Sequence, residues 1–252
     1  MRERIRDELT TVERELGVRV LLAVESGSRA WGMASEDSDY DVRFVYARPV
    51  ADYLRLEGTR DTIEWRLDEV LDVNGWDLSK FLRLVRGSNP TAFEWLSSPI
   101  TYAEVPEFSR VREAAAACFS QKASAFHYLG MEGGHGRAYL RGEEVVAKKY
   151  LYVVRALLAA RWCLEERTPA PMLLSDLIEA KLPERLRPFV DGLLEAKARG
   201  KEHALVPRIP ELDEWVVRDD AELYAQAQSA DAPEKVPWEV LNAVFLETIG
   251  WR

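Results

Sequence analysis

Residues 18–47 place a Gly-Ser turn and a cluster of acids between two short apolar runs. The runs "VRVLLAV" at 18–24 and "YDVRFVYA" at 40–47 are rich in β-branched and aromatic residues, which is typical of strands. After the first run the chain turns on Gly27-Ser28, and four acids follow at positions 36, 37, 39 and 41. Carboxylates this close repel one another, so the pattern indicates that a cation offsets their charge.

Asp39 and Asp41 are the acids that a metal site would use. They are two residues apart at the start of a predicted strand, so both side chains are expected on the same face of the sheet. Such a pair can converge on metal ions held about 3.5–4 Å from each other. Oxygen ligands of this kind suit Mg²⁺, which completes its shell with water and substrate phosphates. Asp39 and Asp41 are therefore predicted to be catalytic metal ligands.

Gly27, Ser28 and Arg29 fit the same site. Glycine lets the backbone approach a phosphate closely, and a serine hydroxyl with its neighbouring N–H groups can hold phosphate oxygens. Arg29 adds a forked cationic donor. The three residues are predicted to bind the triphosphate in a site that transfers a nucleotide. The alternative is a solvated connection in which acids and serines only form turns.

These residues also carry a resemblance. "GSRAWG" followed by "DYD" is similar to the signature of the polymerase-β nucleotidyltransferase superfamily. With "DVNGWDLSKFLRLVRGSNPTAFEWLSSPITY" and "KKYLYVVRALLAARW", the chain resembles, over about residues 25–165, the predicted nucleotidyltransferases of the RNA-ligase-associated (YcgL-like) family. The resemblance implies a polymerase-β-like fold, Mg²⁺ or Mn²⁺ as the metal, and an NTP, ATP first, as substrate. It also implies a role in RNA-end repair.

The superfamily requires a third carboxylate on a neighbouring strand, and three acids are candidates. Asp72 lies inside the strand-like run "VLDVNGW", whereas Asp77 directly precedes the helical pattern "LSKFLRLV" and suits an N-cap. The family pattern also places the acid at Asp72. We predict Asp72 as the third catalytic residue and metal ligand, with Asp77 and Glu64 as the alternatives.

The run "EEVVAKKYLYVVRALLAAR" is the candidate triphosphate clamp. Lys148, Tyr152 and Arg155 are spaced to share one face of a helix, and Lys149 lies beside them. The resemblance implies that this helix faces the active site, with Lys148, Lys149 and Arg155 on the phosphates. The alternative is that these side chains only extend from a buried helix toward solvent.

The fold class expected is α+β, because strand and helix patterns mix over the first hundred residues and helical periodicity dominates from about residue 107. The predicted domains are a nucleotidyltransferase domain with a mixed sheet at 1–105 and a helical domain at 106–252. The glycine-rich stretch "GMEGGHGRAYLRG" at 130–142 is predicted to be a connection between helices, and 226–237 a loop before a last short helix.

Composition limits the possible partners and compartments. The net charge is -9 with a pI near 5.1, so RNA binding would need a local basic surface. The cysteines at 118 and 163 are far apart, which favours reduced, buried thiols in a cytoplasmic protein. No signal-peptide pattern and no apolar stretch of roughly 20 residues is found, so no membrane association is expected.

Three classes of function remain. The first is nucleotide transfer to an RNA end, and the second is the same chemistry on a protein or small molecule. The third is a non-catalytic nucleotide-binding module, which the intact acids at 39 and 41 disfavour. The sequence does not choose between the first two acceptors, and it leaves the oligomeric state open.

Overall fold

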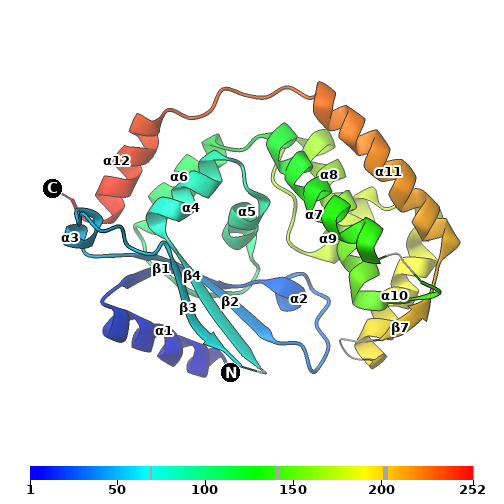
Figure 1. Ribbon diagram of the computed structural model, residues 1–252, viewed down its shortest axis with the longest axis horizontal. Helices are drawn as coiled ribbons and strands as arrows, with labels where there is room; N and C mark the ends of the chain where they lie inside the picture. The colour runs from blue at the N-terminus through cyan, green and yellow to red at the C-terminus, as the bar shows by residue number, and fades with distance from the viewer. Residues whose placement is uncertain (69, 140–141, 201–203, 252) are drawn as a thin grey trace. The chain divides into compact units, whose positions relative to one another are not determined.

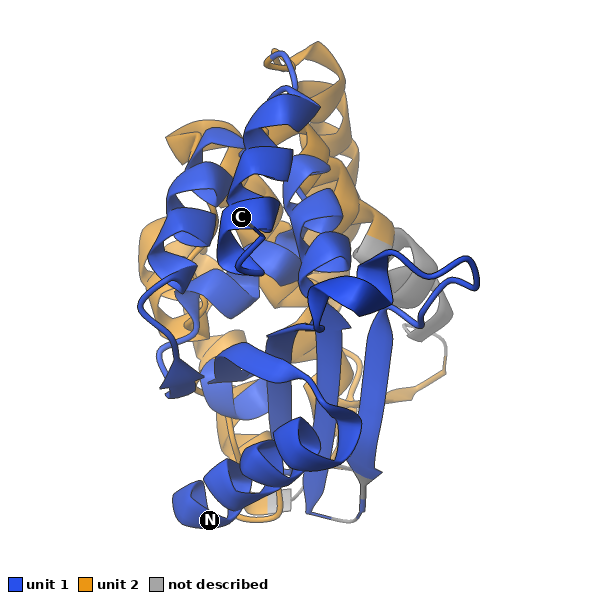
Figure 2. Ribbon diagram, turned by 90° about the vertical axis from the view of Figure 1, so that its left-hand side faces the viewer, with its two compact units in different colours: residues 1–30, 39–119, 234–252 blue, residues 31–38, 120–233 orange. Residues whose placement is uncertain are grey.

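The computed structural model describes residues 1–68, 70–139, 142–200 and 204–251 of the 252-residue chain. The chain divides into two compact units, which Figure 2 shows in different colours. Unit 1 consists of residues 1–30, 39–119 and 234–252, and unit 2 of residues 31–38 and 120–233. The chain therefore passes between the units more than once.

Unit 1 is built on a five-stranded sheet with the strand order β3-β4-β2-β1-β5 (Figure 1). The strands are β1 (Arg19–Glu25), β2 (Tyr40–Ala47), β3 (Thr62–Leu67), β4 (Leu71–Asp77) and β5 (Thr101–Glu104). β2 pairs in parallel with β4, and the other neighbours are antiparallel. Two short helices, α2 (Gly27–Ala30) and α3 (Val50–Tyr53), lie next to β2 in the chain. This is the mixed sheet that the sequence predicts.

One face of the sheet packs against α1 (Arg2–Leu16). Ile5, Leu9 and Val12 recur at helical spacing and are all buried. They belong to a core cluster with every second residue of the central strands, which are Val42, Phe44 and Tyr46 of β2 with Leu71 and Val73 of β4. Because side chains alternate along a strand, the residues between these must point to the opposite face.

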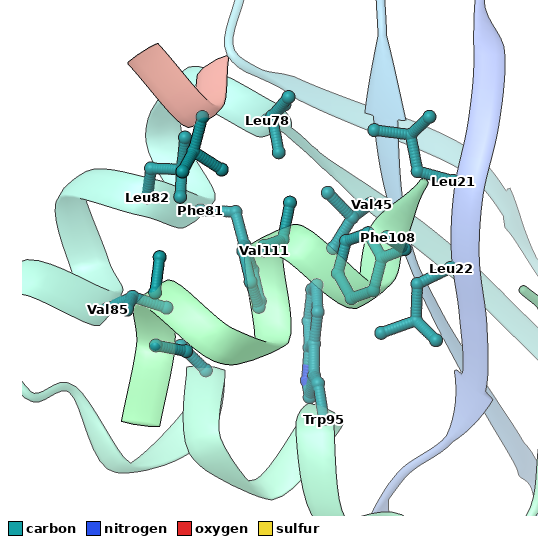
Figure 3. Packing of buried hydrophobic residues seen from close by; sticks show 14 of the residues in the cluster. Leu21, Leu22, Val45, Leu78, Phe81, Leu82, Val85, Trp95, Phe108 and Val111 are labelled. Atoms are coloured by element: carbon teal, nitrogen blue, oxygen red, sulfur yellow. The ribbon is translucent and has the colours of Figure 1, made fainter. Parts of the chain in front are cut away.

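The opposite face carries the second core cluster of unit 1. Four helices contribute to it, namely α4 (Leu78–Arg86), α5 (Pro90–Ser97), α6 (Phe108–Ala117) and α12 (Trp238–Thr248). Figure 3 shows Val45 of β2 and Leu21 and Leu22 of β1 near the aromatic side chains of this cluster. Trp95 is fully buried there and stacks on Trp76, with ring centroids 3.9 Å apart.

Unit 2 is mainly helical. Its helices are α7 (Gln121–Tyr139), α8 (Ala147–Glu166), α9 (Leu174–Lys181), a short 3₁₀ helix (Glu184–Leu186), α10 (Arg187–Gly200) and α11 (Pro210–Ser229). Two short strands, β6 (Glu144–Val146) and β7 (Leu205–Pro207), form an antiparallel pair. α8 packs against α7, α9, α10 and α11. Its buried residues occupy most of its length, so α8 is the central helix of this unit.

The two units differ from the consecutive domains expected at 1–105 and 106–252. α6 belongs to unit 1, because Phe108 and Val111 are buried in the cluster on the sheet. α12 belongs there too, since Leu241 and Val244 join the same cluster. The division into units is decided by tertiary packing between segments that are far apart in sequence. A change in local periodicity along the chain does not reveal such packing.

Two local predictions for unit 2 are wrong. The glycine-rich stretch from residue 130 belongs to α7 as far as Tyr139, while residues 140–141 lie outside the described part of the chain. Residues 144–146 form a strand that pairs with β7, so the helix expected from residue 143 begins at Ala147. In the second segment, pairing with a distant strand overrides the local helical preference.

The surroundings of two glycines in unit 1 predict that their alanine variants differ in stability. A Cβ added to Gly75 of β4 would lie 2.3 Å from the ring of Phe44, whereas one added to Gly58 would meet nothing within 4 Å. We expect Gly75→Ala to lower the free energy of unfolding by about 1–3 kcal/mol through overpacking. Gly58→Ala should change it by less than about 0.5 kcal/mol. Urea denaturation followed by tryptophan fluorescence checks this, and equal midpoints for both variants would contradict the packing.

Candidate active site

Asp41 and Asp72 lie side by side on the two central parallel strands. The register of β2 with β4 pairs Asp41 with Asp72 and Arg43 with Asn74. Val42 and Val73, the residues that follow Asp41 and Asp72, point into the cluster under α1. By alternation, the two acids lie on the face that carries α4, α5 and α6, at the start of both strands. The choice of Asp72 as the neighbour of the D-x-D acids is therefore supported by the register.

Arg43 joins the two acids. Its Nη2 atom lies 3.0 Å from Oδ1 of Asp41 and 2.7 Å from Oδ2 of Asp72. Its Nη1 atom also donates to the carbonyl oxygens of Val42 and Asp72. The Asp41 side chain is 30% exposed, and those of Arg43 and Asp72 are 19% exposed each. Each carboxylate thus directs one oxygen at the same point, which the positively charged guanidinium of Arg43 occupies.

The other two candidates for the third acid have different surroundings. Asp77 is buried, accepts the backbone N–H of Ser79 at 2.8 Å as the N-cap of α4, and accepts the hydroxyl of Tyr53 at 3.0 Å. Its predicted capping role is confirmed. Glu64 of β3 is exposed and pairs in register with Asn74, whose amide donates to Asp72. Of the three candidates, Asp72 is the one opposite Asp41.

Asp39 precedes β2 by one residue and is exposed. Its carbonyl oxygen accepts a hydrogen bond from Nε of Arg29 at 3.1 Å. The guanidinium of Arg29 also lies over the ring of Tyr40, 3.8 Å from the centroid. Arg29 is therefore tied to the start of β2 through both Asp39 and Tyr40.

Gly27 touches the Asp41 carboxylate and tolerates no side chain. Its φ is +60°, and a Cβ built there would lie 2.1 Å from Oδ2 of Asp41. The next residue, Ser28, is buried in α2. The structure thus brings the predicted Gly-Ser turn against one of the predicted metal ligands.

Glu25, which belongs to none of the sequence motifs described above, precedes this turn by two residues. It ends β1, is fully buried, and accepts the backbone N–H of Asp41 at 2.8 Å. Burial is the main reason that the pKa of its carboxyl is raised, while hydrogen bonds from Tyr102 and Asp41 act in the opposite direction. An acid directly after five apolar residues of a strand was the available signal for this residue.

The predicted clamp residues belong to α8 in unit 2. Lys148 and Lys149 are half-buried, and Lys148 Nζ lies 5.6 Å from the centroid of the Tyr152 ring. Arg155 is only 3% exposed; its guanidinium lies over the ring of Trp31 at 4.2 Å and donates to the carbonyl oxygen of Met172. This burial favours a structural role for Arg155 inside unit 2. Contact of these three residues with a triphosphate stays a prediction.

The donor set of the Asp41–Asp72 pair suits a hard divalent cation. Mg²⁺ is commonly held by one or two carboxylates and completes its shell with water and phosphate oxygens. Within the described residues, no group of three or more His, Cys, Asp or Glu side chains is gathered closely enough to hold a metal. The two carboxylates that face Arg43 fit such an ion with further oxygens from a substrate, and Arg43 would have to give up the shared position.

Comparison with known proteins identifies the family of this chain. A family model described as RlaP, RNA repair pathway DNA polymerase beta family, matches residues 1–247. The chain belongs to this family. The sheet and helices described above accordingly form the α+β, polymerase-β-like fold of the RlaP family, and the chain resembles a nucleotidyltransferase.

One curated protein and one solved structure were also matched to this RlaP-family chain. The uncharacterized protein YcgL of Bacillus subtilis (strain 168) is 39% identical over 251 residues, which cover 99% of this chain and 96% of the relative. A crystal structure of a nucleotidyltransferase-like protein from Exiguobacterium sibiricum 255-15 matches at 15% identity with a TM-score of 0.30, covering 98% of this chain and 80% of the other. No helix in the described ranges is both long and apolar enough to span a membrane.

The Arg43 bridge predicts a metal-dependent change in stability. Arg43→Met leaves two half-buried carboxylates facing each other, so we expect the metal-free protein to lose about 1–3 kcal/mol of unfolding free energy. Added Mg²⁺ should restore more stability to this variant than to the unchanged protein, because it replaces the missing charge. Thermal denaturation with and without Mg²⁺ measures both effects.

Arg66 provides the matched control for this experiment. It lies between Glu8 and Asp68 on β3, but its side chain is 41% exposed. Arg66→Met should therefore cause a smaller loss and leave the response to Mg²⁺ unchanged. A response to Mg²⁺ that is the same in both variants would contradict a metal site at Asp41 and Asp72.

Proposed function

We propose that this protein is a metal-dependent nucleotidyltransferase that transfers a nucleotide from an NTP, ATP first, to a hydroxyl group at an RNA end. The observation that carries the proposal is the convergence of Asp41 and Asp72, which each place an oxygen within 3.0 Å of one nitrogen atom of Arg43. The description of the family as part of an RNA repair pathway supports RNA as the acceptor.

The proposed reaction assigns a role to each part of the site. A divalent cation bound there would neutralise the triphosphate and make the acceptor hydroxyl easier to deprotonate. Asp39, Asp41 and Asp72 would hold this metal, and through it the phosphate that is attacked. Asp72 orients the incoming hydroxyl and accepts its proton, while Gly27, Ser28 and Arg29 bind the phosphate oxygens. Pyrophosphate leaves as the new phosphodiester bond forms.

The charge of the chain supports a second acceptor class. The net charge of -9 offers no general attraction for RNA, which proteins usually bind through basic, salt-sensitive surfaces. The same transfer onto a hydroxyl of a protein or a small molecule would not require such a surface. Both possibilities share the metal, the NTP and the acids at 39, 41 and 72, so they differ only in the acceptor.

Transfer of label from each of the four NTPs, labelled at the α-phosphate, tests this function. The purified protein is incubated with Mg²⁺ or Mn²⁺ and with an RNA oligonucleotide, with protein alone, or with small hydroxyl compounds. We expect label on the RNA, and none when the metal is chelated or when Asp41 is changed to Asn. Label on protein or a small molecule would select the second acceptor class, and no transfer from any NTP would contradict the proposed enzyme.

A comparison of Asp72→Asn with Asp77→Asn tests the third acid. Loss of a group that handles the transferred proton slows the chemical step by about 10²–10⁴-fold and leaves ground-state binding intact. Asp72→Asn should therefore stay folded and bind NTP while losing transfer. Loss of an N-cap costs about 0.5–2 kcal/mol, so Asp77→Asn should stay active and melt earlier.

Rates of transfer, NTP affinity and melting temperature are measured side by side for these two variants. The opposite pattern would move the catalytic role to Asp77. Full activity in both would point to Glu64 or to a site with only two carboxylates. Glu64→Gln separates these, since it would lose transfer only in the first case.

A further inference from the structure

Every polar group of Glu25 is bound within unit 1. Its backbone N–H donates to the carbonyl oxygen of Ile100 at 2.9 Å, and its own carbonyl oxygen accepts the Ser98 hydroxyl at 2.6 Å. In the carboxylate, Oε1 accepts the N–H of Asp41 at 2.8 Å and Oε2 accepts the hydroxyl of Tyr102. The side chain is 0% exposed. Glu25 is thus a rigid link between β5 and the start of β2.

These contacts fix the backbone of Asp41 on both sides. Its N–H is bound by the Glu25 carboxylate, and its carbonyl oxygen accepts the N–H of Ser26 at 2.8 Å. Gly27 then touches its side chain from the turn that follows. The end of β1 therefore determines where the Asp41 carboxylate lies. The Asp41 N–H is bound by a side chain, although in a sheet a backbone carbonyl oxygen usually accepts such a hydrogen bond.

Stability alone is a weak reason for such an arrangement. Removing a carboxyl group from water costs several kcal/mol if it is charged, and an apolar side chain at such a site often gives equal or greater stability. The adjacent positions of β1 are all apolar and buried, so the strand itself has no need of an acid here. The need to fix the backbone of Asp41 explains why this position is a glutamate.

We propose that Glu25 is a positioning residue that holds the backbone of Asp41 so that its carboxylate can act as a metal ligand. This inference rests on the proposed function, because it deepens the role of the same site. Glu25 acts through Asp41, and it does so from the opposite side of β2, where its register partner Val42 joins the cluster under α1.

Three variants of the full chain test the role of Glu25. Glu25→Met fills a similar volume but cannot accept the Asp41 N–H, whereas Glu25→Gln can still accept it and can donate its amide to the Tyr102 oxygen. Glu13→Met is the matched control, because the Glu13 carboxylate accepts the N–H of Val20 at 2.8 Å at the other end of β1. The readouts are Mn²⁺ affinity, kcat and KM for transfer, and melting temperature.

We expect Glu25→Met to weaken Mn²⁺ binding and to lower kcat by about 10–100-fold, as loss of a group that supports a metal ligand commonly does. KM for the NTP should change little. Glu25→Gln should recover most of both losses, and Glu13→Met should lower only the melting temperature. If Glu25→Met does not fold, Tyr102→Phe replaces it, since this removes the second anchor of the carboxylate and should weaken Mn²⁺ binding to a smaller extent.

Two results would overturn the inference. One is unchanged Mn²⁺ affinity in the folded Glu25→Met or Tyr102→Phe protein, and the other is an equal loss in Glu13→Met, which would show a general effect on β1. Failure of the proposed function is distinguishable, because it would abolish transfer in the unchanged protein. The role of Glu25 would then still be tested by Mn²⁺ affinity, with Asp41→Asn as the reference for complete loss of binding. An unchanged protein that binds no Mn²⁺ would contradict this role.

Discussion

The parallel pairing of β2 with β4 is the constraint on which the site depends. It places Asp41 opposite Asp72 in the centre of the sheet, and alternation places Val42 and Val73 in the core below. A slip of one residue would bury the acids and expose the valines, so the hydrophobic core and the position of the carboxylates are specified together. The energy that folds the sheet also holds two like charges near each other.

Asp41 is held from both faces of β2, by a different interaction on each. On the face that carries the acids, Arg43 supplies positive charge at the position where both carboxylates converge. On the other face, Glu25 binds the Asp41 backbone from a site that water does not reach. A partly exposed guanidinium and a fully buried acid suit different tasks. The first can yield to a metal, and the second keeps the ligand in place when it does.

Local pattern was enough to predict much of unit 1 and part of its site. β1 and β2 follow from their β-branched and aromatic residues, and α4 follows from its helical pattern. Asp77 was recognisable as an N-cap because this helical pattern begins at the next residue. Arg43 and Glu25 were missed, because their partners are determined by strand register, which joins residues 29 and 16 positions away. β6 was missed for the same reason, since its partner strand is about sixty residues further along the chain. Asp72 was selected with the help of a family resemblance, and the register now supplies a physical reason.

The most direct measurement is a crystal structure of the protein with Mn²⁺ and a non-hydrolysable NTP analogue, using the anomalous signal of the metal. We expect a peak at about 2.0–2.3 Å from oxygens of Asp41 and Asp72, with phosphate oxygens completing the shell. Arg43 should have left its shared position, and the Asp41 N–H should still be bound by Glu25. A metal bound elsewhere, with Arg43 still bridging the two carboxylates, would contradict this account.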